Sequence, residues 1–256
     1  ALDSYNQALG LWQLTTDRRG QAVTLSALGR LYSRMGETQK ALDFFERAMQ
    51  LIRVIGDPIE EARVLNGMAY IYNGLDQKQR ALELYDRALS LFRAANYPNG
   101  EAGTLGDAGR VYFLLGDNDK ALEYLQRSLS IFKTVGDHRM EIAVLKEIGR
   151  IHSARGDKRL ALQSYNTARA FYSEQKDRRG EAATLNLIGS VYQDWGQDQK
   201  ALNSYNRALL LSREAEYPVG EAMTLYSIGN VERDRGNLEQ APTRSEADLK
   251  IVGALR

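Results

Sequence analysis

Apolar and polar residues alternate along this chain with the period of an α-helix. Between residues 180 and 216, apolar residues recur at intervals of three and four from Leu185 to Tyr192, which places them on one helical face. Gly196 interrupts this run, and a second helical stripe follows from Ala201 to Leu211. The pattern predicts two antiparallel helices joined by a short turn. Such a hairpin leaves apolar faces on both sides, so it needs neighbouring hairpins to cover them.

The same pattern recurs about every 40 residues, which identifies the chain as a series of structural repeats. Alanine occupies one phase in seven successive rows, at Ala1, Ala41, Ala81, Ala121, Ala161, Ala201 and Ala241. Glycine, which adopts positive φ without strain and often ends helices, marks the predicted turn inside five of the six pairs, at Gly36, Gly116, Gly156, Gly196 and Gly236. Proline, which lacks an N–H, marks the boundary between pairs at Pro58, Pro98 and Pro218.

We therefore predict one array over residues 1–256. It begins with an unpaired second helix in residues 1–20 and continues with six helix pairs, at 21–60, 61–100, 101–140, 141–180, 181–220 and 221–256. The chain starts without Met and in the middle of a repeat, so we expect it to be excised from a longer protein. The last row departs from the pattern, with Pro242, Ser245 and Asp248 at core phases, and this predicts an irregular final helix.

Several rows also place glycine inside the first helix, although a mid-helix glycine costs roughly 1 kcal/mol relative to alanine. We expect this cost to be offset by close approach of the partner helix. That helix carries small residues at one phase, at Ala48, Ala88, Ala168 and Ala208. Aromatic residues at two further phases are expected to fill the space around each contact, at Tyr32, Tyr72, Tyr112, Tyr192, Phe45, Tyr85, Tyr165 and Tyr205.

The overall charge favours neither nucleic acid nor an anionic membrane as a partner. The chain has 34 Lys and Arg residues against 33 Asp and Glu residues, a net charge of +1. Its first residues lack the basic start of a signal peptide, and no stretch approaches the roughly 18 apolar residues of a membrane helix. We therefore expect a soluble, cytoplasmic protein.

Few side chains are suited to catalysis or metal binding. The chain has no cysteine and two histidines. His152 occupies the phase of the core tyrosines, which favours a packing role over that of a general base. His138 precedes a first helix, next to a phase where aspartate recurs as a turn former or helix cap, at Asp17, Asp57, Asp137 and Asp177. We predict no enzymatic activity, no catalytic residue, no cofactor and no metal.

The pattern L-x-x-[LI]-G-x-x-Y, a short turn, then A-L-x-x-[YF]-x-x-A resembles the tetratricopeptide repeat over essentially the whole chain. Rows of this length, with G-E-A-x-T-L-x-x-[IL]-G, look most like those of kinesin light chain, Pins-type adaptors and bacterial proteins that join such arrays to a CHAT domain. The resemblance implies an all-α, right-handed superhelical solenoid of antiparallel helix pairs. It also implies that the array is a scaffold for binding other proteins.

In the resembling family the first helices line a concave groove, whose positions correspond here to the phases of residues 23, 26, 30, 33 and 34. These positions carry seven basic residues (Arg30, Arg34, Arg63, Arg110, Lys146, Arg150 and Arg233) and two acidic ones (Asp194 and Asp234). Amides at these phases could hold a peptide backbone, and unburied apolar residues could anchor a side chain. The predicted partner-binding residues are Arg30, Arg34, Arg63, Asn66, Tyr70, Asn73, Arg110, Phe113, Lys146, Arg150, Asn186 and Asn230. We expect the partner to be an acidic protein segment or peptide.

Other functions stay open. The array could be the regulatory or substrate-recruiting part of a larger enzyme, such as a CHAT-type protease. It could also self-associate, because the exposed ends of a solenoid can stack on another copy to form a homo-oligomer. RNA binding is a weaker alternative, since the groove lacks a regular series of exposed aromatic residues for base stacking.

Overall fold

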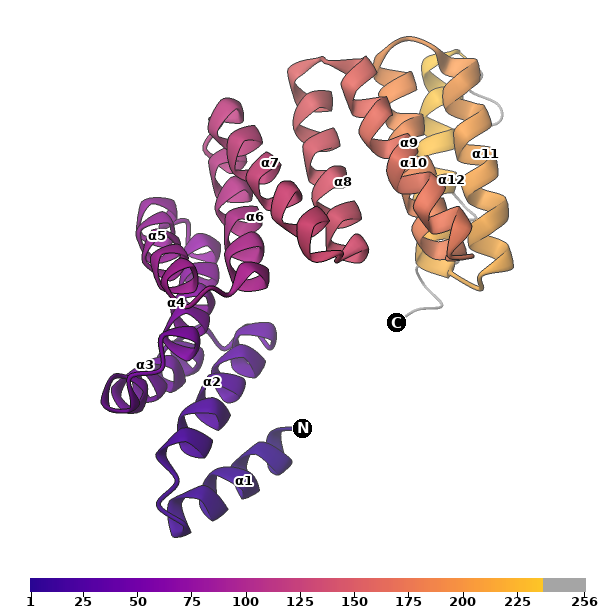
Figure 1. Cartoon of the computed structure of the whole chain (residues 1–256). Coiled ribbons are helices and arrows are strands. Elements are labelled where there is room, and N and C mark those ends of the chain that lie inside the picture. Colours follow the sequence, from indigo (N-terminus) through magenta and orange to yellow (C-terminus); the bar gives the residue numbers. More distant parts are fainter. Residues whose placement is uncertain (237–256) are drawn as a thin grey trace. The chain divides into compact units, whose positions relative to one another are not determined.

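The computed structural model describes residues 1–236, and this part of the chain is all-α (Figure 1). Its twelve helices are α1 (Leu2–Leu14), α2 (Arg18–Arg34), α3 (Thr38–Ile55), α4 (Pro58–Gly74), α5 (Lys78–Ala94), α6 (Pro98–Leu114), α7 (Asn118–Val135), α8 (His138–Arg155), α9 (Lys158–Glu174), α10 (Arg178–Asp194), α11 (Asp198–Glu214) and α12 (Pro218–Asp234). The predicted all-α array of helix pairs is confirmed. The irregular final helix predicted around Pro242 lies outside the described residues.

The chain forms two compact units, Ala1–His138 and Arg139–Arg256. In the first unit, α2 pairs with α3, α4 with α5 and α6 with α7, while α2, α4 and α6 follow one another as neighbouring first helices. In the second unit, α10 pairs with α11, and α10 also contacts α9 and α12. Each unit thus repeats one arrangement, in which consecutive first helices lie beside each other.

Turns recur about every 20 residues, so each repeat of about 40 residues contains two. Each contains one residue with positive φ, whether the turn lies inside a pair or between pairs. Glycine fills this position at the predicted intra-pair turns, including Gly36 (φ 78°) and Gly196 (φ 70°). Gly56 and Gly136 fill it at two turns between pairs, and other residues adopt the same backbone conformation at the remaining turns: Thr16, Asp76, Asn96, Lys176 and Glu216. The backbone geometry of the turns is therefore more regular than the glycine pattern alone indicated.

The first helices begin three residues before the predicted repeat starts, and in α2, α4 and α10 an aspartate caps the N-terminus. Asp17 and Asp177 each accept a hydrogen bond from the backbone N–H three residues ahead, at 3.0 and 2.9 Å. Asp57 accepts from the N–H groups of Ile59 and Glu60, both at 3.1 Å. These carboxylates satisfy N–H groups that have no partner within the helix. Pro58, Pro98 and Pro218 occupy the first helical position, where an N–H is not required.

In three repeats the glycine inside the first helix makes room for an aromatic ring and not, as expected, for the small residues of the partner helix, whereas Gly109 faces Leu125 and the backbone of Ala121. A Cβ atom at Gly29 would lie 2.8 Å from the ring of Phe45, and one at Gly189 would lie 2.5 Å from that of Tyr205. Gly149 bears the same relation to Tyr165. The rings are at most 2% exposed, so each glycine allows a large side chain to enter the space between helices. The alanines at the phase of Ala48 are fully buried but do not set this contact.

A cation covers the tyrosine at the end of most first helices. The charged group lies over the ring at 3.9 Å for Arg80 and Tyr72, and at 5.3 to 5.7 Å for Lys120 and Tyr112, Lys200 and Tyr192, and Lys40 and Tyr32. These contacts hold the two helices of one repeat together near the turn. The fourth repeat lacks the pair, with His152 and Leu160 at the two positions. His152 is largely buried and lies 3.4 Å from Asp157, in agreement with a packing role.

Candidate partner-binding site

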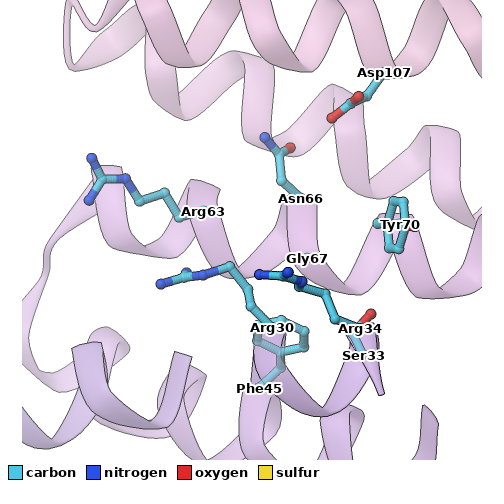
Figure 2. A pocket seen from close by; sticks show the side chains of 9 residues that line it. All are labelled: Arg30, Ser33, Arg34, Phe45, Arg63, Asn66, Gly67, Tyr70 and Asp107. Carbon is cyan, nitrogen blue, oxygen red and sulfur yellow. The ribbon is translucent and has the colours of Figure 1, made fainter. Parts of the chain in front are cut away.

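A pocket of about 360 Å³ opens between α2, α4 and α6 in the first unit. Its volume is near the lower end of the range for ligand pockets, roughly 300 to 1,000 Å³. Figure 2 shows α4 running between the side chains from α2 and the carboxylate from α6. The lining residues are Arg30, Ser33, Arg34, Phe45, Arg63, Asn66, Gly67, Tyr70 and Asp107. We call this site the α2–α4–α6 pocket.

The pocket exists because two positions depart from the repeat pattern. Gly67 occurs where the other first helices carry a residue with a side chain: Ala27, Asp107, Glu147, Leu187 and Ser227. No side chain therefore fills the space above the ring of Phe45, which forms the floor of the pocket. Phe45 occurs where three other repeats have tyrosine, so no hydroxyl projects from the buried ring. A Cβ atom at Gly67 would lie 2.4 Å from the tip of the Phe45 ring, which shows how closely α4 approaches it.

Five of the predicted partner-binding residues line this pocket: Arg30, Arg34, Arg63, Asn66 and Tyr70. Asn73, Arg110 and Phe113 lie on α4 and α6 of the same unit but outside the pocket lining. Lys146, Arg150, Asn186 and Asn230 belong to the second unit. The structure therefore brings together a subset of the predicted site on three consecutive first helices.

Arg30 and Arg34 are the distinctive charges of the pocket. They stand one turn apart on α2, both are exposed, and both extend toward α4 in Figure 2. Within the described part of the chain, neither forms an ion pair. Two cations held close together without a counter-ion favour the binding of an anion.

The other predicted cations already have partners. Arg63 donates to Glu60 at 2.5 Å and to the hydroxyl of Tyr97 at 3.2 Å. Arg110 donates to Asp107 at 2.6 Å, and Arg150 donates to Glu147 at 3.0 Å.

Lys146 donates to the hydroxyl of Tyr172 at 3.0 Å and lies over the same ring. Arg233 pairs with Asp234 at 3.2 Å. Local pairing thus offsets much of the positive charge that the chosen groove positions suggested.

Two of the predicted amides connect one repeat to the next. Asn66 donates to the hydroxyl of Thr104 at 2.7 Å, and Asn186 donates to that of Thr224 at 2.8 Å. Each threonine in turn donates to a backbone carbonyl one turn earlier in its own helix. The amide Oδ1 of Asn66 is buried without a partner among the described residues, as is that of Asn73.

Asp107 is the main pocket residue that the sequence reasoning did not select. Asp107 lies at the phase of residue 27, next to the predicted groove phase of residue 26. Its negative charge is therefore absent from the predicted charge of the groove. Burial raises the pKa of the Asp107 carboxyl above its usual value, although the nearby Arg110 opposes this shift. Burial also raises the pKa of Tyr85, and the charge of Asp107 adds to that shift.

Within residues 1–236, no group of three or more His, Cys, Asp or Glu side chains is placed to hold a metal ion. None of the described helices combines the length and apolar character that crossing a membrane requires.

Several solved structures have the same fold as this chain. BtubC from P. vanneervenii is 18% identical, with a TM-score of 0.75 over 84% of this chain and 90% of that protein. Kinesin light chain-like repeats from Podosopora anserina are 18% identical, with a TM-score of 0.65 over 75% of this chain and 95% of that one. A Rap protein complexed with Competence and Sporulation Factor is 16% identical, with a TM-score of 0.68 over 99% and 70%.

No curated protein sequence matches the chain. Models of the tetratricopeptide repeat match residues 1–54, 34–94, 60–134 and 100–174, and a second model of the same repeat matches residues 182–214. These matches cover most of the sequence and agree with the helix pairs of the structure. The chain belongs to the tetratricopeptide repeat family.

Proposed function

We propose that this array is a protein-interaction scaffold that binds an acidic segment of a partner polypeptide in the α2–α4–α6 pocket. Family membership supports the general role of a scaffold. The observation that carries the finer proposal is the pair Arg30 and Arg34, which has no carboxylate partner among the described residues and lines a pocket.

An apolar contact accompanies this charge. Tyr70 lines the same pocket, and 58% of its side chain is exposed. A large aromatic residue that the core does not bury is a typical anchor at protein interfaces. The ligand that satisfies both features is a segment with a carboxylate for the arginines and an apolar side chain next to Tyr70. No chemical transformation of the ligand is part of this proposal.

Selection from a displayed library of random peptides tests the proposal. Wild-type protein is expected to enrich peptides that combine acidic and apolar residues. Synthetic versions of these peptides should bind the Arg30→Ala/Arg34→Ala variant about ten- to a hundredfold more weakly, because charged hydrogen bonds contribute roughly 1.5 to 3 kcal/mol and 1.4 kcal/mol is tenfold in affinity.

Arg53→Ala is the matched control. Arg53 is an exposed arginine in the last turn of α3, outside the pocket, so its removal changes the net charge of the first unit without touching the site. Equal affinity of the double variant and wild type would contradict the proposal. Arg18, an exposed residue at the start of α2 that does not line the pocket, completes a control that removes two charges. Equal losses of affinity in Arg30→Ala/Arg34→Ala and in Arg53→Ala/Arg18→Ala would attribute binding to overall charge instead of the pocket.

A further inference from the structure

The two sides of the α2–α4–α6 pocket differ in charge and in hydrogen-bonding character. On the α2 side, Arg30 and Arg34 offer only donors. On the opposite side, across α4, Asp107 offers carboxylate oxygens (Figure 2). Asn66, on α4 between them, has an amide oxygen that accepts no hydrogen bond from any described residue. The pocket therefore presents donors at one end and acceptors at the other.

Arg110 compensates the charge of Asp107 only in part. The guanidinium of Arg110 lies 2.6 Å from one carboxylate oxygen, Oδ1, and both residues are on the same helix. Burial nevertheless disfavours the ionised carboxylate more than Arg110 stabilises it, since the pKa of Asp107 is raised. Oδ2 accepts no hydrogen bond from any described residue, so a second cation or N–H donor close to it would stabilise this half-buried charge.

We propose that the pocket recognises a dipolar segment, in which an acidic residue contacts Arg30 and Arg34, an apolar residue contacts Tyr70, and a basic residue contacts Asp107. This inference rests on the proposed function and adds the basic residue and the order of the three contacts. Because the cations Arg30 and Arg34 stand on the α2 side and the Asp107 carboxylate on the α6 side, a segment placed across α4 in the reverse direction would set its basic residue against the arginines and its acidic residue against Asp107. The charges thus fix the direction in which the segment crosses the pocket.

Peptides selected by three forms of the protein test the inference. Wild type should enrich peptides in which one acidic and one basic residue flank an apolar residue. Asp107→Asn, which keeps the size of the side chain, should lose the preference for the basic residue and retain that for the acidic one. Arg30→Ala/Arg34→Ala should show the reverse. Asp86→Asn, an exposed carboxylate on α5 outside the pocket, is the control and should select the same peptides as wild type.

Affinities of synthetic peptides then give the size of the effect. Replacing the basic residue of a selected peptide by glutamine should weaken binding to wild type about tenfold and leave binding to Asp107→Asn within about twofold of its starting value. Circular dichroism of each variant establishes that the fold is retained.

The outcomes separate the two proposals. If wild type selects acidic and apolar residues without basic ones, or if Asp107→Asn still prefers basic residues, the dipolar segment is ruled out and the acidic one stands. If selection is unaffected by Arg30→Ala/Arg34→Ala, or if no peptide is enriched, the proposed function fails and this inference fails with it.

Discussion

The interfaces that α2 and α10 form with their neighbours, α3 and α4 for α2 and α11 and α12 for α10, have the same architecture and different chemistry. In both, a glycine of the first helix accepts a buried aromatic ring from the second helix of its pair: Gly29 on α2 accepts Phe45 on α3, and Gly189 on α10 accepts Tyr205 on α11. At the α10 interface, however, Ser190 and Asp194 stand where α2 has Arg30 and Arg34. The glycine that admits the ring is thus the same in the two regions, and the exposed residues on the same helix differ.

The floor of the two interfaces differs as well. The hydroxyl of Tyr205 donates to Gln193 at 3.1 Å, and Ser227 occupies the position of Gly67. Phe45 has no hydroxyl, and Gly67 has no side chain to cover it. A hollow therefore forms at the α2–α4 interface as a by-product of two substitutions that the array tolerates. The pocket thus forms at the two positions where the sequence departs from its repeat, Gly67 and Phe45.

The largest expected effect tests what the two regions share. Phe45→Ala and Tyr205→Ala should each lower the free energy of unfolding by about 3 to 5 kcal/mol, because each leaves a cavity in place of a large buried ring. Urea denaturation followed by circular dichroism measures both losses. Tyr70→Ala, at an exposed aromatic residue, is the control and should change stability by less than about 0.5 kcal/mol. A much smaller loss for either ring would show that the two interfaces are not held by the same contact.

A pH titration tests where the two regions differ. Burial raises the pKa of Tyr205 to about 12, and the charge of Asp194 contributes, whereas a hydrogen bond with Ser227 lowers it. An unfolded tyrosine ionises near pH 10, so the stability due to neutral Tyr205 is complete below about pH 10 and is lost as the pH rises toward 12. The contribution is at most about 3 kcal/mol, since the two values differ by about two pKa units and each unit corresponds to 1.36 kcal/mol.

Tyr205→Phe removes this titration, as Phe45 naturally does at the other interface. The variant should be about 1 kcal/mol less stable than wild type at pH 8, because the hydrogen bond to Gln193 is lost. It should lose less stability than wild type between pH 9 and pH 11.5. Parallel stability curves over that range would contradict the raised pKa.

Much of the array could be predicted from the sequence, because its determinants are local and periodic. Helical stripes, turn glycines and proline positions each recur about every 40 residues, so one repeat checks another. The exact partner of the internal glycine was missed for a steric reason. Small residues on facing helices suggest close backbone approach, but the geometry instead admits the ring of Phe45 or Tyr205.

The site was harder to predict because charge compensation depends on neighbours outside the groove phases that were read. Glu60, Asp107 and Glu147 each lie three residues before a groove arginine on the same helix and pair with it. Pairs at this spacing are readable in the sequence, and including them would have removed Arg63, Arg110 and Arg150 from the unpaired groove cations. The pocket itself depends on the absent side chain of Gly67, which only a three-dimensional contact with Phe45 makes significant.

The link between repeats is expected to be equal in the two units. Asn66 with Thr104 and Asn186 with Thr224 form the same hydrogen bond, at 2.7 and 2.8 Å. A double-mutant cycle with Asn→Ala and Thr→Val should give a coupling energy of about 1 kcal/mol for each pair. Combining Asn66→Ala with Thr224→Val is the control and should be additive. Coupling in one pair and not the other would show that this contact, too, differs between the regions.

The smallest effect should have the opposite sign. Ser26 occupies the phase of Asn66 and Asn186, but Val64 stands where their threonine partners would be, 38 residues later. The Oγ of Ser26 is fully buried and has no hydrogen-bond partner among the described residues. Leaving a buried hydroxyl unpaired costs roughly 1 kcal/mol or more, and alanine is the better helix former. Ser26→Ala should therefore raise the free energy of unfolding by up to about 1 kcal/mol, which is measured as a higher midpoint of urea denaturation.

The matched variant is Thr104→Ala, which removes a hydroxyl that has partners on both sides and should destabilise the protein by about 1 to 2 kcal/mol. Val64→Thr, which supplies the missing partner, should bring Ser26→Ala from stabilising to neutral or destabilising, because the hydroxyl of residue 26 then has a neighbour to bond. If Ser26→Ala destabilises the protein as much as Thr104→Ala does, the serine hydroxyl has a partner of its own, and the Asn–Thr link is not the only polar contact between first helices at this phase among residues 1–236.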